Sequence, residues 1–130
     1  MLRRNLLLGV AGVAVLGVTG CATHPVSVHQ ATELPVAQLR TCIKRAAHRR
    51  GWRVVTDEPG KMRIKYVKGP HVLVADVTYD NEGYMIEAVK EGSTLFNKDG
   101  TAHRKVNSWT ANLTVTIREE ENKILLRQTN

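Results

Sequence analysis

The chain has 130 residues, which is enough for one small domain. Basic residues outnumber acidic ones by 19 to 12, and aromatic residues make up only 5% of the chain, too few for an exposed stacking surface that binds sugars or bases. The sequence contains no phosphate-cradling glycine loop, no His/Glu pair at metal-ligand spacing on a helix and no nucleophile elbow. We therefore expect no enzymatic activity, no cofactor and no metal site.

The first twenty residues have the organisation of an export signal. Arg3 and Arg4 form a short basic start, and an uncharged apolar stretch follows as far as Val18. A membrane-spanning helix needs about 20 apolar residues, and this stretch is shorter and rich in glycine. The residues Val18-Thr19-Gly20-Cys21 resemble the lipobox of bacterial lipoproteins, in which the cysteine is acylated and becomes the mature N-terminus. Residues 1–20 are therefore predicted to be a lipoprotein signal peptide.

The lipobox resemblance implies where the mature protein resides. It implies three acyl chains on Cys21, which anchor the protein to a membrane. An aspartate after the cysteine commonly signals retention in the inner membrane, so Ala22 implies the outer membrane, facing the periplasm. Loss of Arg3 and Arg4 leaves 17 basic residues against 12 acidic ones, a net charge of +5, which attracts anionic lipids or polymers of the cell envelope. Exported proteins do not normally meet nucleic acid, and none is expected as a partner.

Residues 21–34 show no sustained hydrophobic period and are predicted to be a flexible, lipid-anchored tether. Residues 35–50 are predicted to form a helix, because a proline stands at its start and a glycine follows its end. Its apolar stripe includes Cys42, which has no disulfide partner if the sulfur of Cys21 carries lipid. We expect Cys42 to be a buried, unreactive thiol.

Four strands are predicted at residues 52–56, 61–67, 72–79 and 84–90, because the hydrophobic period changes to two. The second and third hairpins have a register that places the apolar residues of three strands on one face. This face consists of Met62, Ile64, Tyr66, Leu73, Ala75, Val77, Tyr79, Tyr84, Ile86 and Ala88. On the opposite face Arg63 lies across from Asp76, and this ion pair supports the register. Trp52 and Val54 join the core face if the first hairpin has a five-residue loop.

The last predicted element is a helix over residues 106–118. Val106, Trp109, Leu113 and Ile117 recur at helical spacing, although residues 113–117 also alternate as in a strand. Trp109 is expected to anchor the core. The domain is assigned to residues 35–122, and residues 123–130 are predicted to be a C-terminal tail. The predicted fold is an α+β two-layer sandwich of order α-β-β-β-β-α, a four-stranded antiparallel meander with two helices on one face.

The segment His103-Arg104-Lys105-Val106-Asn107-Ser108-Trp109, followed by Asn112-Leu113, resembles a pattern in a family of small uncharacterised proteobacterial lipoproteins. In that family a His, an Asn four residues later and a Trp two residues after the Asn begin the last helix. The preceding meander ends in Tyr-x-Ile, here Tyr84-Met85-Ile86. Ala88 and Val106 stand where the family tends to have aromatic residues. The resemblance implies the sandwich fold and no known activity.

No catalytic or metal-binding residue is assigned. His103 and Asn107 stand one helical turn apart and are expected to cap the last helix and to seat it on the sheet. We expect a non-catalytic binding or assembly component of the envelope, whose partner is another envelope protein or the cell wall. The alternative is a binder of an anionic ligand or polymer through a basic helix and strand edge. The candidate residues are Arg40, Lys44, Arg45, His48, Arg49, Lys61, Arg63 and Lys65. Salt should weaken the second kind of binding more than the first.

Overall fold

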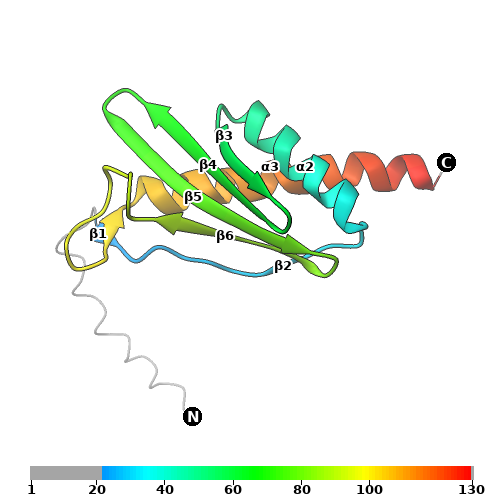
Figure 1. The fold of residues 1–130 in the computed structure, drawn as a ribbon, viewed down its shortest axis with the longest axis horizontal. Coiled ribbons are helices and arrows are strands. Elements are labelled where there is room, and N and C mark those ends of the chain that lie inside the picture. The colour runs from blue at the N-terminus through cyan, green and yellow to red at the C-terminus, as the bar shows by residue number, and fades with distance from the viewer. Residues whose placement is uncertain (1–21, 130) are drawn as a thin grey trace, which may run out of the picture.

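The computed structural model describes residues 22–129, so the predicted signal peptide and Cys21 lie outside the described residues. One layer is an antiparallel sheet of strand order β2-β6-β5-β4-β3, and two helices form the other layer (Figure 1). The elements in chain order are β1 (Ala22–Thr23), β2 (Gln30–Ala31), α2 (Val36–Arg49), β3 (Arg53–Glu58), β4 (Lys61–Lys68), β5 (His71–Asp80), β6 (Gly83–Val89), β7 (Ala102–His103) and α3 (Lys105–Gln128). The predicted α+β class is confirmed.

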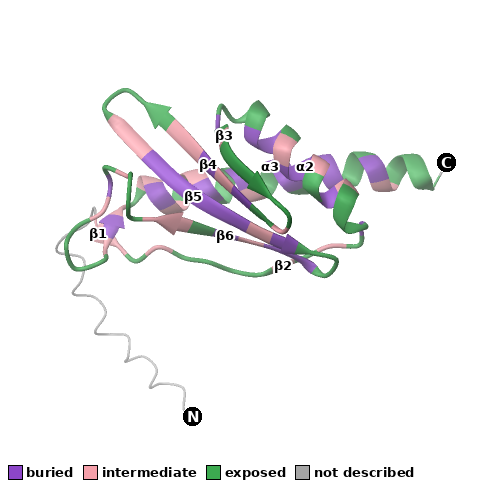
Figure 2. Ribbon diagram, in the orientation of Figure 1, coloured by how far each residue is buried: buried purple, intermediate pink, exposed green. Residues whose placement is uncertain are grey.

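The core lies between the helices and the predicted apolar face of the sheet. Ile64 pairs with Ala75 and Val77 pairs with Ile86, as the sequence predicts. These strand residues pack with buried residues of both helices, among them Ile43 of α2 and Leu113 of α3. β5 is buried along its central part (Figure 2). The predicted register is therefore confirmed for the second and third hairpins.

The first hairpin differs from the prediction. Glu58 of β3 pairs with Lys61 of β4, so the turn has two residues instead of five. The pairing then shifts by one residue just after Val54, at a β-bulge. Because the bulge adds one residue to β3, Val54 still pairs with Ile64 and packs against the core, and Trp52 is buried.

The segment predicted to be a flexible tether lies along the domain instead. β1 pairs with β7, and β2 pairs with the outer edge of β6, so the sheet has five strands and not the predicted four. Between these two strands, the Asn107 side chain of α3 accepts a hydrogen bond from the Val26 N–H and donates one to the His24 carbonyl, both at 2.9 Å. We call residues 24–29 the N-terminal strap. Residues 22–31 are held by two-residue strand pairings and by side-chain hydrogen bonds. Because such contacts need no regular apolar spacing, the sequence shows no hydrophobic period there.

The last helix extends beyond the predicted residues 106–118 and includes most of the predicted tail. It has 24 residues. Ile124 packs with Leu34 and Cys42 in a second, smaller core, and this contact continues the helix where the sequence is mostly charged. None of the helices in the described part of the chain is long and apolar enough to span a bilayer.

Candidate functional site

The residues predicted to bind an anionic ligand lie on two different faces of the domain. Arg40, Lys44, Arg45, His48 and Arg49 belong to α2, which packs on the core face of the sheet. Lys61, Arg63 and Lys65 alternate along β4 with two buried residues, and therefore point to the opposite face. The basic helix and the basic strand thus form two separate surfaces, as the predicted register, with the helices on the apolar face, implies.

On the first face, Arg40 and Lys44 are bound to Asp57 of β3. The Arg40 guanidinium donates hydrogen bonds of 3.3 and 2.5 Å to the carboxylate, and the Lys44 ammonium lies 3.2 Å from it. Hydrogen bonding from Arg40 lowers the pKa of Asp57, although partial burial opposes this shift. The carboxylate is therefore ionised at neutral pH, and it partly neutralises both cations.

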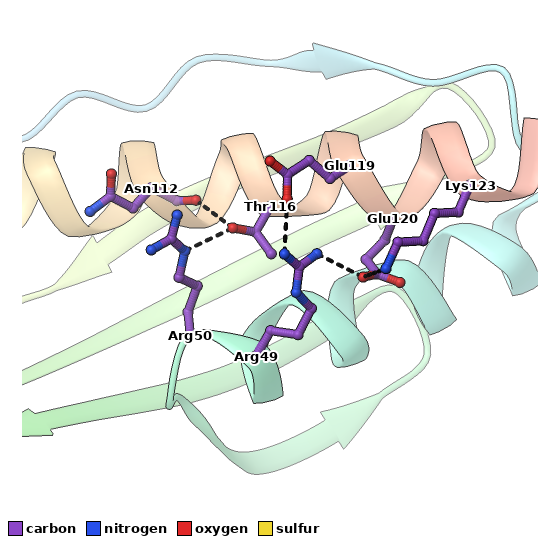
Figure 3. A network of polar contacts seen from close by, with 7 residues as sticks. All are labelled: Arg49, Arg50, Asn112, Thr116, Glu119, Glu120 and Lys123. Carbon is purple, nitrogen blue, oxygen red and sulfur yellow. Dashed lines mark hydrogen bonds and ion pairs between the residues drawn. The ribbon is translucent and has the colours of Figure 1, made fainter.

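A second network joins the two helices (Figure 3). The Arg49 guanidinium donates to Glu119 at 3.0 Å and to Glu120 at 2.8 Å, and Lys123 donates to Glu120 at 3.0 Å. The Glu120 side chain is only 4% exposed. Its burial raises the pKa of that carboxyl, but the hydrogen bonds from Lys123 and Arg49 outweigh the burial and the pKa is lowered. Arg49 is thus a structural link between α2 and α3.

Next to this network, Arg50 at the end of α2 contacts Thr116 in the middle of α3 (Figure 3). The Arg50 guanidinium donates to the Thr116 hydroxyl at 2.8 Å, and that hydroxyl donates to the Asn112 carbonyl at 3.0 Å. Bonding back to the carbonyl four residues earlier satisfies a buried hydroxyl within a helix. Arg50 and Arg49 together fix the end of α2 on α3.

On the opposite face of the sheet, Arg63 forms a two-point contact with Asp76. The two hydrogen bonds measure 2.7 and 2.9 Å, and the Lys61 ammonium lies 3.7 Å from the same carboxylate. Hydrogen bonding from Arg63 lowers the pKa of Asp76. The predicted cross-strand pair is confirmed, and Asp76 engages two of the three cations on this face.

Three of the candidate residues have no carboxylate within 4.0 Å among the residues that the structure describes: Arg45, His48 and Lys65. Arg45 and His48 border a hollow of about 550 Å³ between α2 and α3. The other residues that line it are Lys44, Arg49, Glu120, Lys123 and Arg127. Two of these three residues thus lie at this hollow, which also includes two α3 cations that sequence reasoning missed.

The predicted pair at the start of α3 has two separate tasks. His103 Nδ1 accepts a hydrogen bond from the Lys105 N–H at 3.1 Å and so caps the helix. Asn107 binds the N-terminal strap, not the sheet. Burial and the nearby Lys105 lower the pKa of His103, whose ring centre lies 6.0 Å from that of His71. No cluster of three or more His, Cys, Asp or Glu side chains suited to a metal ion occurs within residues 22–129.

Trp109 lies at the rim of the core instead of at its centre. Its side chain is partly buried and packs edge-on against Tyr66 at 4.8 Å between ring centres. Tyr66 in turn lies 5.4 Å from Trp52. The expected role as an anchor is supported in part, because Trp109 contacts the core but keeps an exposed edge.

An apolar groove of about 380 Å³ lies between the N-terminal strap and α3. Val26 and Val28 of the strap form one wall, Ala111 and Val115 of α3 form the other, and Ile86 of β6 lies between them. Sequence reasoning missed this groove. The alternation of apolar and polar residues in Val26-Ser27-Val28 is the signal that could have indicated an ordered, extended strap.

The remaining candidates are the two cysteines. Cys42 is buried, as the sequence predicts, and burial raises the pKa of its thiol to about 11. Its low reactivity stays a prediction. The residue after Cys21, Ala22, pairs with His103 in β7. Comparison of the chain with models of protein families, with curated proteins and with solved structures gives no match.

Proposed function

We propose that this chain is a bacterial envelope lipoprotein, acylated at Cys21, with a non-catalytic role in binding or assembling other envelope components. The basic start, the apolar stretch and the lipobox-like residues before Cys21 support export and acylation. The pattern around His103 and Trp109 supports a place among the small proteobacterial lipoproteins that it resembles. Ala22 after the cysteine favours the outer membrane, with the domain in the periplasm.

The observation that carries this proposal is the lipobox-like sequence Val18-Thr19-Gly20-Cys21, and the pairing of β1 with β7 shows where the domain begins after it. Ala22 is covalently joined to the predicted lipid-bearing residue and already belongs to the folded domain. Acyl chains on Cys21 would therefore hold the domain directly against the membrane, without a free linker. Several cations lie at this end of the domain. The Lys90 ammonium donates a hydrogen bond to the backbone carbonyl of Lys98, and Arg104 and Lys105 lie at the start of α3. These positive charges suit a surface of anionic lipid headgroups.

Replacement of the acylated cysteine tests the proposal. Cys21→Ser should abolish incorporation of labelled palmitate and release the protein from the membrane fraction, because stable anchoring needs two or more acyl chains. Cys42→Ala is the matched control, and it should keep both the label and the membrane location. Recovery of Cys21→Ser in the membrane fraction, with residues 1–20 still attached, would show an uncleaved membrane helix and overturn the proposal.

A second candidate function rests on the hollow between α2 and α3. Arg45 has no carboxylate partner among the described residues, and the hollow as a whole has an excess of positive charge. This observation supports capture of an anionic polymer of the envelope. Arg45→Glu should then weaken retention on a polyanion column and flatten its salt dependence. Lys65→Glu makes the same charge change on the opposite face, and equal losses in both variants would exclude a specific site in the hollow.

A further inference from the structure

Exposed apolar side chains gather beside the groove at the N-terminal strap. Seven large hydrophobic residues in the described part of the chain are exposed, and three of them border this groove: Val26 at 58%, Val28 at 56% and Val115 at 44%. The helix wall between them is made of small side chains, Thr110, Ala111 and Thr114, which leave room beside α3. Exposed apolar surface concentrated at a hollow is typical of a binding site.

The groove is bounded along its outer side by a strap that is fixed at both ends. Asn107 holds the strap at His24 and Val26, and the pairing of Gln30 with Tyr84 holds its other end. A peptide strand laid in this groove would place backbone N–H and C=O groups against apolar walls, which are made by Val26, Val28, Ala111 and Val115. An acyl chain is much narrower and has no backbone polar groups that need hydrogen-bond partners. The groove is therefore suited to an acyl chain more than to a peptide strand.

A guanidinium lies at the end of the groove that is distant from Asn107. Arg118 lines the groove, and its Nη2 donates a long hydrogen bond of 3.4 Å to the Gln30 side chain. Among the described residues, no carboxylate lies within 4.0 Å of Arg118. This cation can bind an anionic head group, for which a guanidinium offers two parallel donors. On α3 the distance from Asn107 to Arg118 is about 16 Å.

We infer that this groove binds a free fatty acid, with the acyl chain along α3 and the carboxylate at Arg118. Val26, Val28 and Val115 lose contact with water when the chain is bound. Ile86 supplies the apolar floor beneath it. The site does not depend on acylation of Cys21, because none of the groove residues belongs to the lipid anchor.

Photolabelling tests this inference. A myristate with a photoreactive diazirine in its chain is added to the cell fraction that contains the full chain, and the labelled peptides are identified by mass spectrometry. Labels are expected in residues 22–30 and 107–118, and unlabelled myristate should compete for them. Arg118→Gln should raise the concentration of unlabelled myristate needed to halve the labelling about tenfold, the equivalent of one charge-assisted hydrogen bond. Arg118→Lys should raise it much less.

Two further variants separate the groove from general partitioning into membranes. Ala111→Phe fills the groove with an apolar side chain and should abolish the label, while Ala37→Phe makes the same change on an exposed position of α2 and should not. Undiminished labelling of Ala111→Phe would overturn the inference. If myristyl alcohol competes as well as myristate, the carboxylate has no role in binding. If a lysophospholipid competes better than myristate, the ligand is a lysophospholipid and not a fatty acid. A photoreactive residue at Val115 that captures a polypeptide would establish a peptide site instead.

Discussion

Asn107→Ala is expected to release the N-terminal strap while the rest of the domain stays folded. The Asn107 side chain makes two hydrogen bonds of 2.9 Å to the strap, one to the Val26 N–H and one to the His24 carbonyl. Each such bond contributes a net 1 kcal/mol or so, and the loss of both therefore costs the docked strap about 2 kcal/mol. The global free energy of unfolding should fall by no more than the free energy that holds the strap on the domain, because the strap can detach locally while the core stays packed. The better helix preference of alanine recovers roughly 0.5 kcal/mol of this loss.

Hydrogen exchange measured by mass spectrometry checks this prediction. A loss of about 2 kcal/mol should speed the exchange of the Val26 amide, the strap amide that donates to Asn107, roughly 30-fold, while the amides of β5 stay protected because the strap can detach without opening the core. Asn112→Ala is the matched control, because the Asn112 side chain makes no contact with the strap among the hydrogen bonds of the described residues. Unchanged exchange in Asn107→Ala, or an equal loss of protection in β5, would refute the argument that Asn107 acts as a local clasp.

Three further predictions concern the stability of the domain. Trp109→Ala should lower the free energy of unfolding by about 2–3 kcal/mol, less than for a fully buried aromatic residue, as measured by urea denaturation. Since hydrogen bonding from Arg63 lowers the pKa of Asp76 in the folded state, its contribution to stability is present above the unfolded pKa of about 4 and is lost as the pH falls through the lower folded value. Asp76→Asn should therefore be less stable than the parent at pH 7, with a smaller loss of stability on acidification. Because the thiol of Cys42 has a pKa raised to about 11, its contribution to stability should be complete below pH 8 and decrease as the pH rises towards 11, and iodoacetamide should alkylate it only after unfolding.

The central sheet could be predicted because its information is local. The alternation of apolar residues in β4, β5 and β6 determines which face is buried, and a shift of one residue would bring that face into water. The opposite charges of Arg63 and Asp76 independently support the same pairing. Even the first hairpin kept Val54 on the correct face, because the bulge compensated for a turn that was shorter than expected.

The edges of the fold could not be predicted because their contacts are distant in sequence. Gln30 meets Tyr84 in a strand of only two residues, which is too short to show an alternating pattern. The end of α3 is stabilised by the contact of Ile124 with Leu34, a pair that only the complete fold brings together. The same limit explains the charged candidates. Side-chain counts gave a basic helix, but they did not show that Asp57 and Glu120 already bind its cations.

The docked strap relates the two proposals to each other. The strap begins beside the predicted lipid anchor and runs along α3 from its N-terminal end, as Figure 1 shows. An anchor on Cys21 would therefore place the Asn107 end of the groove nearer to the membrane and the Arg118 end farther from it. A fatty acid bound with its carboxylate at Arg118 would then have its methyl end directed towards the bilayer. Charge reversal at Lys98 and Arg104 should weaken the contact of the domain with anionic lipid without changing the labelled groove peptides, because those two cations do not line the groove. If such a variant lost both the contact with anionic lipid and the labelling of the groove peptides, the groove would be formed only against the membrane surface.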